Sequence, residues 1–179
     1  VTEPSNGTLT FETDGTFIYV HDGSETTTDS FTYKANDSTA DSNTVTVTIT
    51  VNPVNDLPLA QNDSSSVAEG ATINVPTVLS NDTDAEGNTL TAANVTSPSN
   101  GSIVFNDDGT FTYVHDGSET TTDSFTYITN DGTADSNTAT VVINITAIND
   151  APVASADAYP VYEGATLNGV TVLNNDTDA

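Results

Sequence analysis

The sequence predicts an all-β protein, a tandem array of small antiparallel β-sandwiches. The first observation is an internal repeat: the stretch HDGSETTTDSFTY occurs at residues 21–33 and again at 115–127. Residues 1–85 align with 95–179 without a gap, and about two-thirds of the positions are identical. The second observation is a period-2 alternation of apolar and polar residues, and the third is the placing of turn residues between the alternating segments.

The alternation predicts where the strands lie. In TVTVTITV (44–51) the valines and Ile49 fall on one side and the threonines on the other, as a half-buried strand requires. Asn-Gly and Asp-Gly pairs supply turn residues that tolerate positive φ. For the complete middle repeat we expect an Ig-like sandwich of seven antiparallel strands, near 58–62, 71–78, 89–95, 102–106, 110–115, 123–129 and 138–147.

The repeat also predicts the domain boundaries. They fall at VNPVNDLP (51–58) and ITAINDAP (145–152), where a strand ends and a proline follows. The chain then divides into the later strands of a first domain (1–54), a complete second domain (55–148) and the opening strands of a third (149–179). The linkers are short and carry no Gly/Ser run, so we expect a fairly stiff array.

The composition excludes several classes of partner. One Lys, no Arg and 26 Asp plus Glu give a formal charge of −25, so a nucleic acid is excluded and direct membrane insertion is not expected. Cations are the natural partners, and a merely solvated acidic surface is the alternative. The absence of Cys rules out disulfides, and if so polar a chain is secreted, a metal is the usual alternative means of stabilising it.

A cluster of acids in one loop favours calcium. NDTDAEGN (81–88) reads D-x-D-x-E-G, in which alternate carboxylates converge on one hard cation and the glycine permits a sharp turn. Ala93 stands where an EF-hand requires its twelfth-position Glu, so the loop is not an EF-hand. Any remaining ligands must come from elsewhere in the fold.

This layout resembles cadherin repeats and, more closely, the bacterial cadherin-like or Ig-like repeats of large RTX-type adhesins. The resemblance covers the whole chain and implies Ca²⁺ at the linkers between domains. It implies linker ligands, an early Glu, a late Glu within DGSE, an acid before the last strand and the D-x-D acids with a following Asn. The implied metal ligands are Glu25, Asn55, Asp56, Glu69, Asp82, Asp84, Asn88, Glu119, Asp131, Asn149, Asp150, Asp176 and Asp178, with Glu163 the counterpart of Glu69.

Two departures from the cadherin pattern reduce the ion count that we expect. Ser24 and Ser118 replace the Arg of the late element, and Pro53 and Ala147 stand where the linker's first Asp would be. Asp63 and Asp157 lie seven residues beyond each linker. The sequence leaves undecided whether they are metal ligands or turn residues. His21 and His115 are expected to have structural or surface roles.

The expected function is mechanical. The chain has no Cys nucleophile, one Lys, two His and no G-x-S-x-G elbow, so no catalytic constellation is visible. We expect a non-enzymatic, calcium-rigidified spacer of a large secreted bacterial surface adhesin, whose partners are the neighbouring repeats. One alternative is an extracellular filament of identical chains joined head-to-tail by strand exchange. The other alternative is a ligand-binding Ig-like module, but the sequence has no aromatic cluster that would support it.

Overall fold

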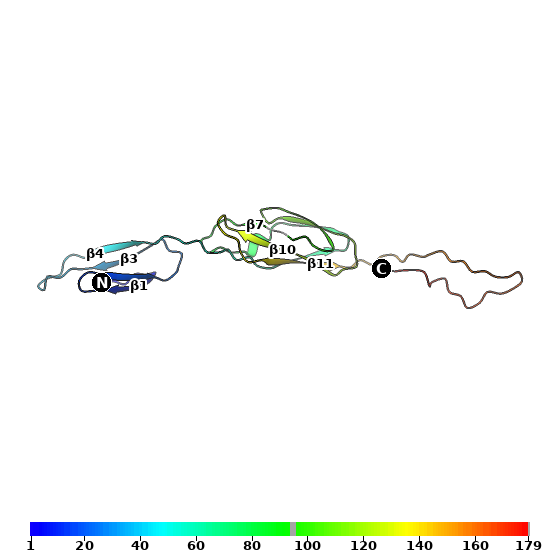
Figure 1. Cartoon of the computed structure of the whole chain (residues 1–179), viewed down its shortest axis with the longest axis horizontal. Helices are drawn as coiled ribbons and strands as arrows, with labels where there is room; N and C mark the ends of the chain where they lie inside the picture. Colours follow the sequence, from blue (N-terminus) through cyan, green and yellow to red (C-terminus); the bar gives the residue numbers. More distant parts are fainter. Residues whose placement is uncertain (94–95, 179) are drawn as a thin grey trace. The chain divides into compact units, whose positions relative to one another are not determined.

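The computed structural model describes residues 1–93 and 96–178, and they form strands, turns and loops (Figure 1). The chain divides into two compact units. Unit 1 comprises Val1–Leu57 together with Thr83–Thr89, and unit 2 comprises Pro58–Asp82 together with Leu90–Ala179. Each unit has strands and a hydrogen-bonding framework of its own.

Unit 1 consists of two β-hairpins. Strand β1 (Gly7–Phe11) pairs with β2 (Phe17–His21), and β3 (Thr28–Tyr33) pairs with β4 (Val45–Thr50), both antiparallel. The ring of Phe31 lies between the two hairpins, with its centroid 5.9 Å from that of Phe11 and 5.1 Å from that of Phe17. These edge-on aromatic contacts are the centre of a small apolar cluster.

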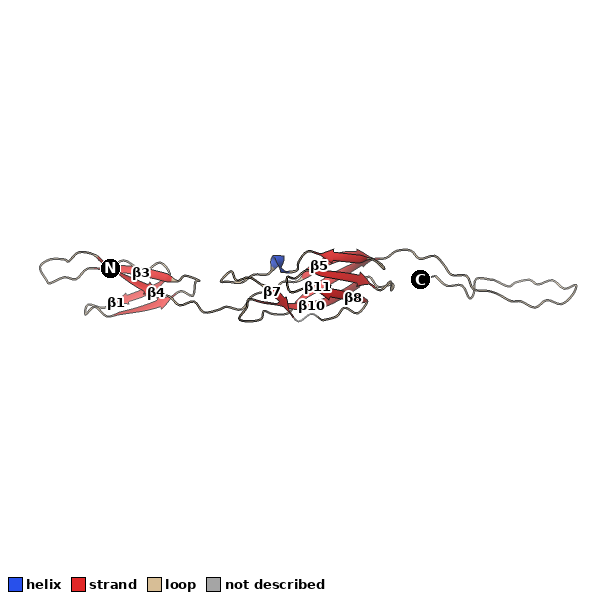
Figure 2. Ribbon diagram, turned by 90° about the horizontal axis from the view of Figure 1, so that it is seen from above, coloured by secondary structure: helices blue, strands red, loops and turns tan. Residues whose placement is uncertain are grey.

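Unit 2 is a two-sheet sandwich. One sheet has the strand order β5-β11-β10-β7 and the other has the order β6-β9-β8. Figure 2 shows these strands against the surrounding loops. The strands are β5 (Asp63–Ala68), β6 (Thr72–Val75), β7 (Thr91–Ala93), β8 (Gly101–Phe105), β9 (Phe111–His115), β10 (Thr122–Asn130) and β11 (Ala139–Thr146).

The predicted all-β sandwich class is confirmed, with one difference in strand direction. β5 runs parallel to β11, with Asp63 opposite Val141 and Ala68 opposite Thr146, whereas the other pairs of named strands among the described residues are antiparallel. Two parallel strands need a long connection rather than a hairpin. Here β6 to β10 lie between β5 and β11 in the sequence and supply that connection. Alternation along a single strand carries no information about the direction of its partner.

The first strand of the middle repeat was predicted at 58–62, and the structure corrects it to β5 at 63–68. The segment Asp63–Ala68 reads DSSSVA and has no apolar alternation, because it is an edge strand held by main-chain hydrogen bonds to β11. The strand predicted at 71–78 ends at Val75, before Pro76, and a 3₁₀ turn follows at Leu79–Asn81. The remaining predicted strands are found within two residues at each end, except that residues 94–95 lie outside the described residues.

The core of unit 2 joins the two sheets. The largest fully buried side chains include Tyr113 on β9, Phe125 and Tyr127 on β10, and Val141 on β11. Phe111 packs edge-on against Phe125 with ring centroids 5.1 Å apart. Each buried aromatic contributes on the order of 2 kcal/mol through apolar burial alone, so these rings are a main source of this unit's stability.

Residues 149–178 form no strand. Their regular pairing consists of one isolated bridge between Val153 and Thr177, and Figure 1 shows them as an open loop at the orange and red end. The assignment of 149–179 to the opening strands of a third domain stays a prediction. In unit 2 the equivalent strands, β5 and β6, pair with β11 and β9.

Candidate metal centres

The repeated thirteen-residue stretch builds a turn that presents a glutamate. In unit 1, His21 Nε2 lies 2.9 Å from Thr26 Oγ1, and the Gly23 N–H donates to His21 Nδ1 at 3.2 Å. The Ser24 N–H donates to Asp22 Oδ1 at 2.9 Å, which closes the turn. The turn is therefore held by its own side chains, and Glu25 is exposed at its end.

The same bonds recur in unit 2, where His115 Nε2 lies 3.0 Å from Thr120 Oγ1 and Gly117 N–H donates to His115 Nδ1. His115 is buried, and its Nδ1 also accepts a hydrogen bond from the Gly70 N–H at 3.0 Å. The two histidines thus have structural roles in positioning the turns that carry Glu25 and Glu119.

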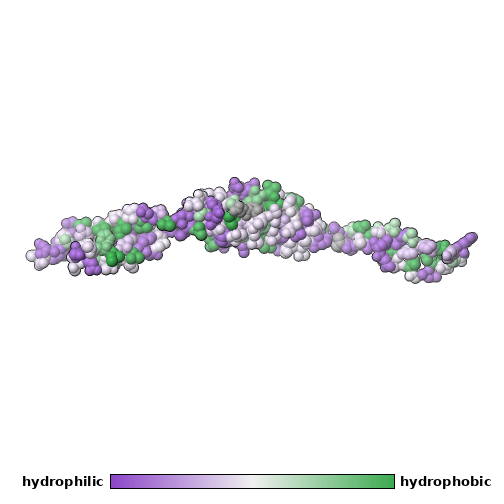
Figure 3. Space-filling model, viewed as in Figure 1, coloured by the Kyte–Doolittle hydropathy of each residue, from purple (hydrophilic) through white to green (hydrophobic). Residues whose placement is uncertain are grey.

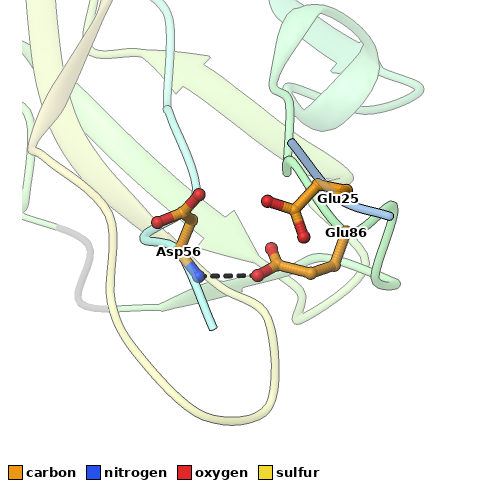
Figure 4. A group of neighbouring side chains, drawn as sticks. All are labelled: Glu25, Asp56 and Glu86. Atoms are coloured by element: carbon orange, nitrogen blue, oxygen red, sulfur yellow. Dashed lines mark hydrogen bonds between the residues drawn. The ribbon is translucent and has the colours of Figure 1, made fainter. Parts of the chain in front are cut away.

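The first carboxylate cluster lies within unit 1. Oxygen atoms of Glu25, Asp56 and Glu86 all lie within 4.8 Å of one another. Figure 4 shows the side chains of Glu25 and Glu86 next to each other, with Asp56 facing them. The backbone N–H of Asp56 donates to Glu86 Oε1 at 2.7 Å, which fixes Glu86 against the segment that follows β4.

The second carboxylate cluster lies within unit 2. Oxygen atoms of Glu69, Glu119 and Asp150 again lie within 4.8 Å of one another. Glu69 is buried in the turn between β5 and β6, and its Oε2 accepts a hydrogen bond from the Ile148 N–H at 3.0 Å. This contact holds the chain just before Asp150 close to the turn that carries Glu69.

The two clusters use equivalent positions of the repeat. Glu25 corresponds to Glu119 and Asp56 corresponds to Asp150. The third member is Glu86, from the loop before β7, in the first cluster and Glu69, from the turn after β5, in the second. Each cluster therefore contains a turn glutamate, an aspartate after the last strand of a repeat, and one further glutamate.

The carboxylates of the second cluster repel one another. The negative charge of Glu69 is the largest cause that raises the pKa of Glu119, followed by partial burial and a hydrogen bond with Glu69. The charges of Asp150 and Asp178 raise the pKa of Glu119 further. Two carboxylates ~4 Å apart repel by about 1 kcal/mol in water and about 4 kcal/mol at an effective dielectric constant of 20. A nearby cation would relieve this repulsion.

The donor set fits calcium. All the clustered atoms are oxygens, and two oxygens on opposite sides of one Ca²⁺ lie up to ~5 Å apart, because Ca²⁺–O distances are ~2.3–2.6 Å. In the loop before β7, Asp84 Oδ2 and Glu86 Oε2 are buried without a hydrogen-bond partner among the described residues. A buried carboxylate oxygen without a partner is unfavourable unless a cation compensates it. A cavity of about 470 Å³, lined by Glu25, Asn55, Glu86 and Asn88 among others, adjoins the first cluster.

Some implied ligands make hydrogen bonds within the protein. Asp82 Oδ1 accepts hydrogen bonds from the Gln61 N–H at 2.8 Å and the Tyr127 O–H at 3.1 Å, and burial raises the pKa of Asp82. Asp63 Oδ2 lies 3.0 Å from the same hydroxyl. Asp63, for which the sequence left two roles undecided, therefore also makes a contact within unit 2. The carboxylate of Asp131 accepts two backbone N–H bonds from its own turn.

The other implied ligands lie close to these clusters in sequence. Asn55 and Asn149 each donate a side-chain N–H to the backbone carbonyl of the following aspartate. The Asn88 N–H donates to Asp84 Oδ1 at 2.8 Å. Asp176 Oδ1 accepts from the Ser155 N–H at 2.9 Å, and Asp178 lies near enough to Glu119 to raise its pKa.

Glu86 was not among the residues implied as ligands, although it belongs to the D-x-D-x-E pattern. The resemblance assigned Asp82 and Asp84 from that pattern, and both lie outside the three-carboxylate cluster. Glu86 directly precedes Gly87, which has a positive φ of 74° and makes a turn there. The signal that could have found Glu86 is its place immediately before this glycine.

Both units share one β-strand framework, and each has a carboxylate cluster that includes an aspartate after the last strand of a repeat. The family described as bacterial cadherin-like domain matches residues 55–147, and the family described as bacterial Ig domain matches residues 1–50. The first match covers just over half of the chain. The chain therefore belongs to the bacterial cadherin-like domain family. Domains of this family are extracellular surface domains that generally bind Ca²⁺ and are typically structural rather than enzymatic.

Similar sequences also occur in animal proteins. The chain is 45% identical over 91 residues to chondroitin sulfate proteoglycan 4 of Homo sapiens, and 43% identical over 90 residues to that of Mus musculus. Each match covers 48% of this chain and 4% of the relative, so the chain spans a small part of those proteins. Among the described residues, no helix is of the length and hydrophobicity needed to cross a membrane.

Proposed function

We propose that this chain is a non-enzymatic, calcium-rigidified spacer segment of a secreted bacterial surface adhesin. The observation that carries the proposal is the occurrence of two carboxylate clusters at equivalent positions, each including an aspartate that follows the last strand of a repeat. Membership of a family of extracellular structural domains supports the same function.

Calcium would supply charge neutralisation at each cluster. Glu25, Asp56 and Glu86 would hold one ion, and Glu69, Glu119 and Asp150 would hold another. Asp56 and Glu86 lie on the segments that lead into β5 and β7 of the next repeat, so an ion bound there restricts those segments relative to β2–β4. We infer that neighbouring repeats of the same chain are the partners in this contact. The bound ion would hold these repeats at a fixed distance from each other.

The expected size of the effect follows from binding linkage. Extracellular calcium modules bind with dissociation constants of ~10⁻⁴–10⁻³ M. At a calcium concentration one hundred times the dissociation constant, one ion stabilises the bound form by ~2.7 kcal/mol. For domains of this size such a change raises the melting temperature by roughly 10 °C or more.

Calcium binding is tested by calorimetric titration and by thermal melts in calcium and in EDTA. We expect a stoichiometric calcium signal that magnesium does not reproduce, and a lower melting temperature in EDTA. Glu119→Gln should weaken binding at the second cluster, while Glu12→Gln, an exposed acid outside both clusters, serves as the matched control. Unchanged melts in EDTA, or equal effects of the two variants, would contradict the proposal.

The mechanical part is tested separately by small-angle scattering of the chain in calcium and in EDTA. A rigid spacer should show a longer maximum dimension and a narrower distribution of shapes in calcium. Identical scattering in the two buffers, together with confirmed calcium binding, would mean that the ion stabilises each unit without stiffening the array.

A further inference from the structure

The first and the last named strands of unit 2, β5 and β11, are direct neighbours. They run parallel over six residue pairs, from Asp63 opposite Val141 to Ala68 opposite Thr146. β5 is also the edge strand of a sheet with the order β5-β11-β10-β7, so β11 is its partner within that sheet. The strand that begins the sandwich is therefore tied directly to the strand that ends it.

Tension along the chain pulls these two strands at opposite ends. The segment that precedes Asp63 pulls β5 from its N-terminal end, whereas the segment that follows Thr146 pulls β11 from its C-terminal end. Because the strands are parallel, the two pulls act along the ladder in opposite directions and place it in shear. The hydrogen bonds of the ladder then share the tension. Strands that are pulled apart at one end instead lose their hydrogen bonds one after another.

Side-chain hydrogen bonds extend this ladder beyond the N-terminal end of β5. The side chain of Asn137 accepts from the Ala60 N–H at 3.1 Å and donates to the Ala60 carbonyl at 2.9 Å. Asn62 Oδ1 accepts from the Thr140 N–H at 2.8 Å. These bonds continue the contact with the β11 segment from Asp63 back to Ala60, where tension enters β5.

Hydrogen bonds of Glu69 extend the ladder at its other end. The Glu69 N–H donates to the Thr146 carbonyl at 2.9 Å, and the Ile148 N–H donates to Glu69 Oε2 at 3.0 Å. Residues 60–69 are thus bonded along their length to residues 137–148. We call this the β5–β11 contact.

Apolar packing is a small part of what holds β5. Val67 is the one buried residue of its six. Other contacts of this segment with the core are polar, because the Tyr127 hydroxyl lies 3.0 Å from Asp63 Oδ2 and 2.9 Å from the Gln61 carbonyl. Figure 3 shows mostly hydrophilic or intermediate residues on the visible face of unit 2, drawn in the middle. Resistance to sliding of β5 therefore comes mainly from hydrogen bonds.

We propose that the β5–β11 contact is a shear clamp that resists unfolding of unit 2 under tension along the chain. Unfolding along this axis requires β5 to slide past β11, so the hydrogen bonds between residues 60–69 and 137–148 must break together. The unfolding rate governs behaviour under force, and this barrier sets that rate. The clamp follows from strand pairing and does not need the proposed calcium sites, whereas its use in a spacer rests on the proposed function.

The test measures the unfolding rate of the full chain under constant force along two axes, in calcium throughout. The sequence has no cysteine, so handles attach to pairs of introduced thiols. Leu57→Cys with Ala151→Cys pulls unit 2 along the chain and places the clamp in shear. Leu57→Cys with Thr138→Cys pulls at the starts of both strands and opens the same contact from one end. All three positions are exposed.

We expect unfolding at equal force to be slower by about tenfold or more along the chain than on the peeling axis, because several hydrogen bonds must break at once. Equal rates on the two axes, or faster unfolding along the chain, would overturn the clamp. Either result would leave the proposed calcium sites and the spacer function standing, since neither depends on the direction of pulling.

A variant of Asn137 tests the end of the clamp where tension enters. Asn137→Ala removes both hydrogen bonds to Ala60 and should speed unfolding along the chain by roughly fivefold or more. Asn106→Ala is the matched control, because it removes a side-chain hydrogen bond to Thr110 Oγ1 in the turn between β8 and β9, outside the clamp. The control should change the same rate by less than about twofold.

Equal acceleration by Asn137→Ala and Asn106→Ala along the chain would contradict the assignment of Asn137 to the clamp. On the peeling axis a merely destabilising change at Asn137 would speed unfolding as much as it does along the chain, which would also contradict that assignment. The comparison of the two axes needs no change at Asn137, so it remains decisive if Asn137→Ala fails to fold.

Discussion

Units 1 and 2 contain the same local framework but differ in how far that framework is buried. Asp29 in unit 1 accepts hydrogen bonds from the Ser5 N–H at 2.9 Å and the Tyr19 O–H at 3.0 Å. Asp123 in unit 2 accepts the equivalent bonds at 3.0 and 2.9 Å. The hairpins therefore keep their internal contacts whether or not residues equivalent to 58–79 cover them.

The difference lies in the aromatic residues at the covered face. Phe17 contacts Phe31 with ring centroids 5.1 Å apart, and Phe111 contacts Phe125 at the same distance, yet Phe111 is buried and Phe17 is not. Hairpin pairing and aromatic contact are thus properties of β1–β4 and β8–β11 themselves. Closure of the core depends on the segment that carries β5 and β6.

The largest expected difference between the units comes from removing these two rings. Phe111→Ala should lower the free energy of unfolding of unit 2 by about 3–5 kcal/mol, because it leaves a cavity in a closed core. Phe17→Ala should change the stability of unit 1 by less than about 1 kcal/mol in dilute solution, because the ring is already half-exposed. Urea unfolding followed by circular dichroism measures both. Equal losses would mean that the face of unit 1 is covered in solution.

A second pair of variants compares two tyrosine hydroxyls. Tyr127 is fully buried, and its hydroxyl lies 2.9 Å from the Gln61 carbonyl and 3.0 Å from Asp63 Oδ2. Tyr127→Phe should destabilise unit 2 by about 1–3 kcal/mol, because two part-buried acceptors lose the donor of a buried hydroxyl. Tyr33→Phe, the matched change in unit 1, should stay within about 0.5 kcal/mol. Chemical unfolding of the two variants measures both losses of stability. Equal losses would contradict the prediction.

A third pair of variants separates backbone strain from packing. Gly15 and Gly109 both have positive φ, 90° and 77°, so alanine strains both positions alike. Only at Gly109 does a Cβ meet Leu79 and Thr77, each at 2.8 Å. Gly109→Ala should therefore cost about 1–2 kcal/mol more than Gly15→Ala in thermal melts. A difference near zero would show that Leu79 moves aside freely.

The smallest expected difference between the units is their response to acid. Burial opposes ionisation of Asp29, but its backbone N–H donors outweigh burial and lower the pKa to about 2. Burial likewise opposes ionisation of Asp123, and the equivalent donors lower its pKa. A lowered folded-state pKa gives stability that is complete above pH ~4 and is lost as the pH falls towards 2.

Asp29→Asn and Asp123→Asn should therefore remove this acid-dependent loss from one unit each, without changing the other. A circular-dichroism titration from pH 6 to pH 2 follows the transitions. Acid transitions that do not move in either variant would exclude these two carboxylates as the cause.

Much of the fold was predictable because its signals are local. The alternation in Val45–Thr50 and Ala139–Thr146 and the turn glycines identify β4, β11 and the hairpins. Asp63–Ala68 escaped prediction because an edge strand needs only its main chain and one buried residue, Val67. The candidate site residues, too, were only partly predictable from local signals. The repeat identified Glu25 and Glu119, but it had no means of showing that Asp82 lies against Tyr127 while Glu86 joins the cluster.

The sequence alone determined the repeat, its strands, its turns and the acidic positions that recur, because each depends on neighbours along the chain. Tertiary structure alone decided which carboxylates meet, since Glu25, Asp56 and Glu86 are brought together by segments that are distant in the sequence. It also decided the parallel pairing of β5 with β11 and the burial of Phe111. The physical reason is that side-chain periodicity specifies which face of a strand is apolar, whereas only long-range packing specifies what that face contacts.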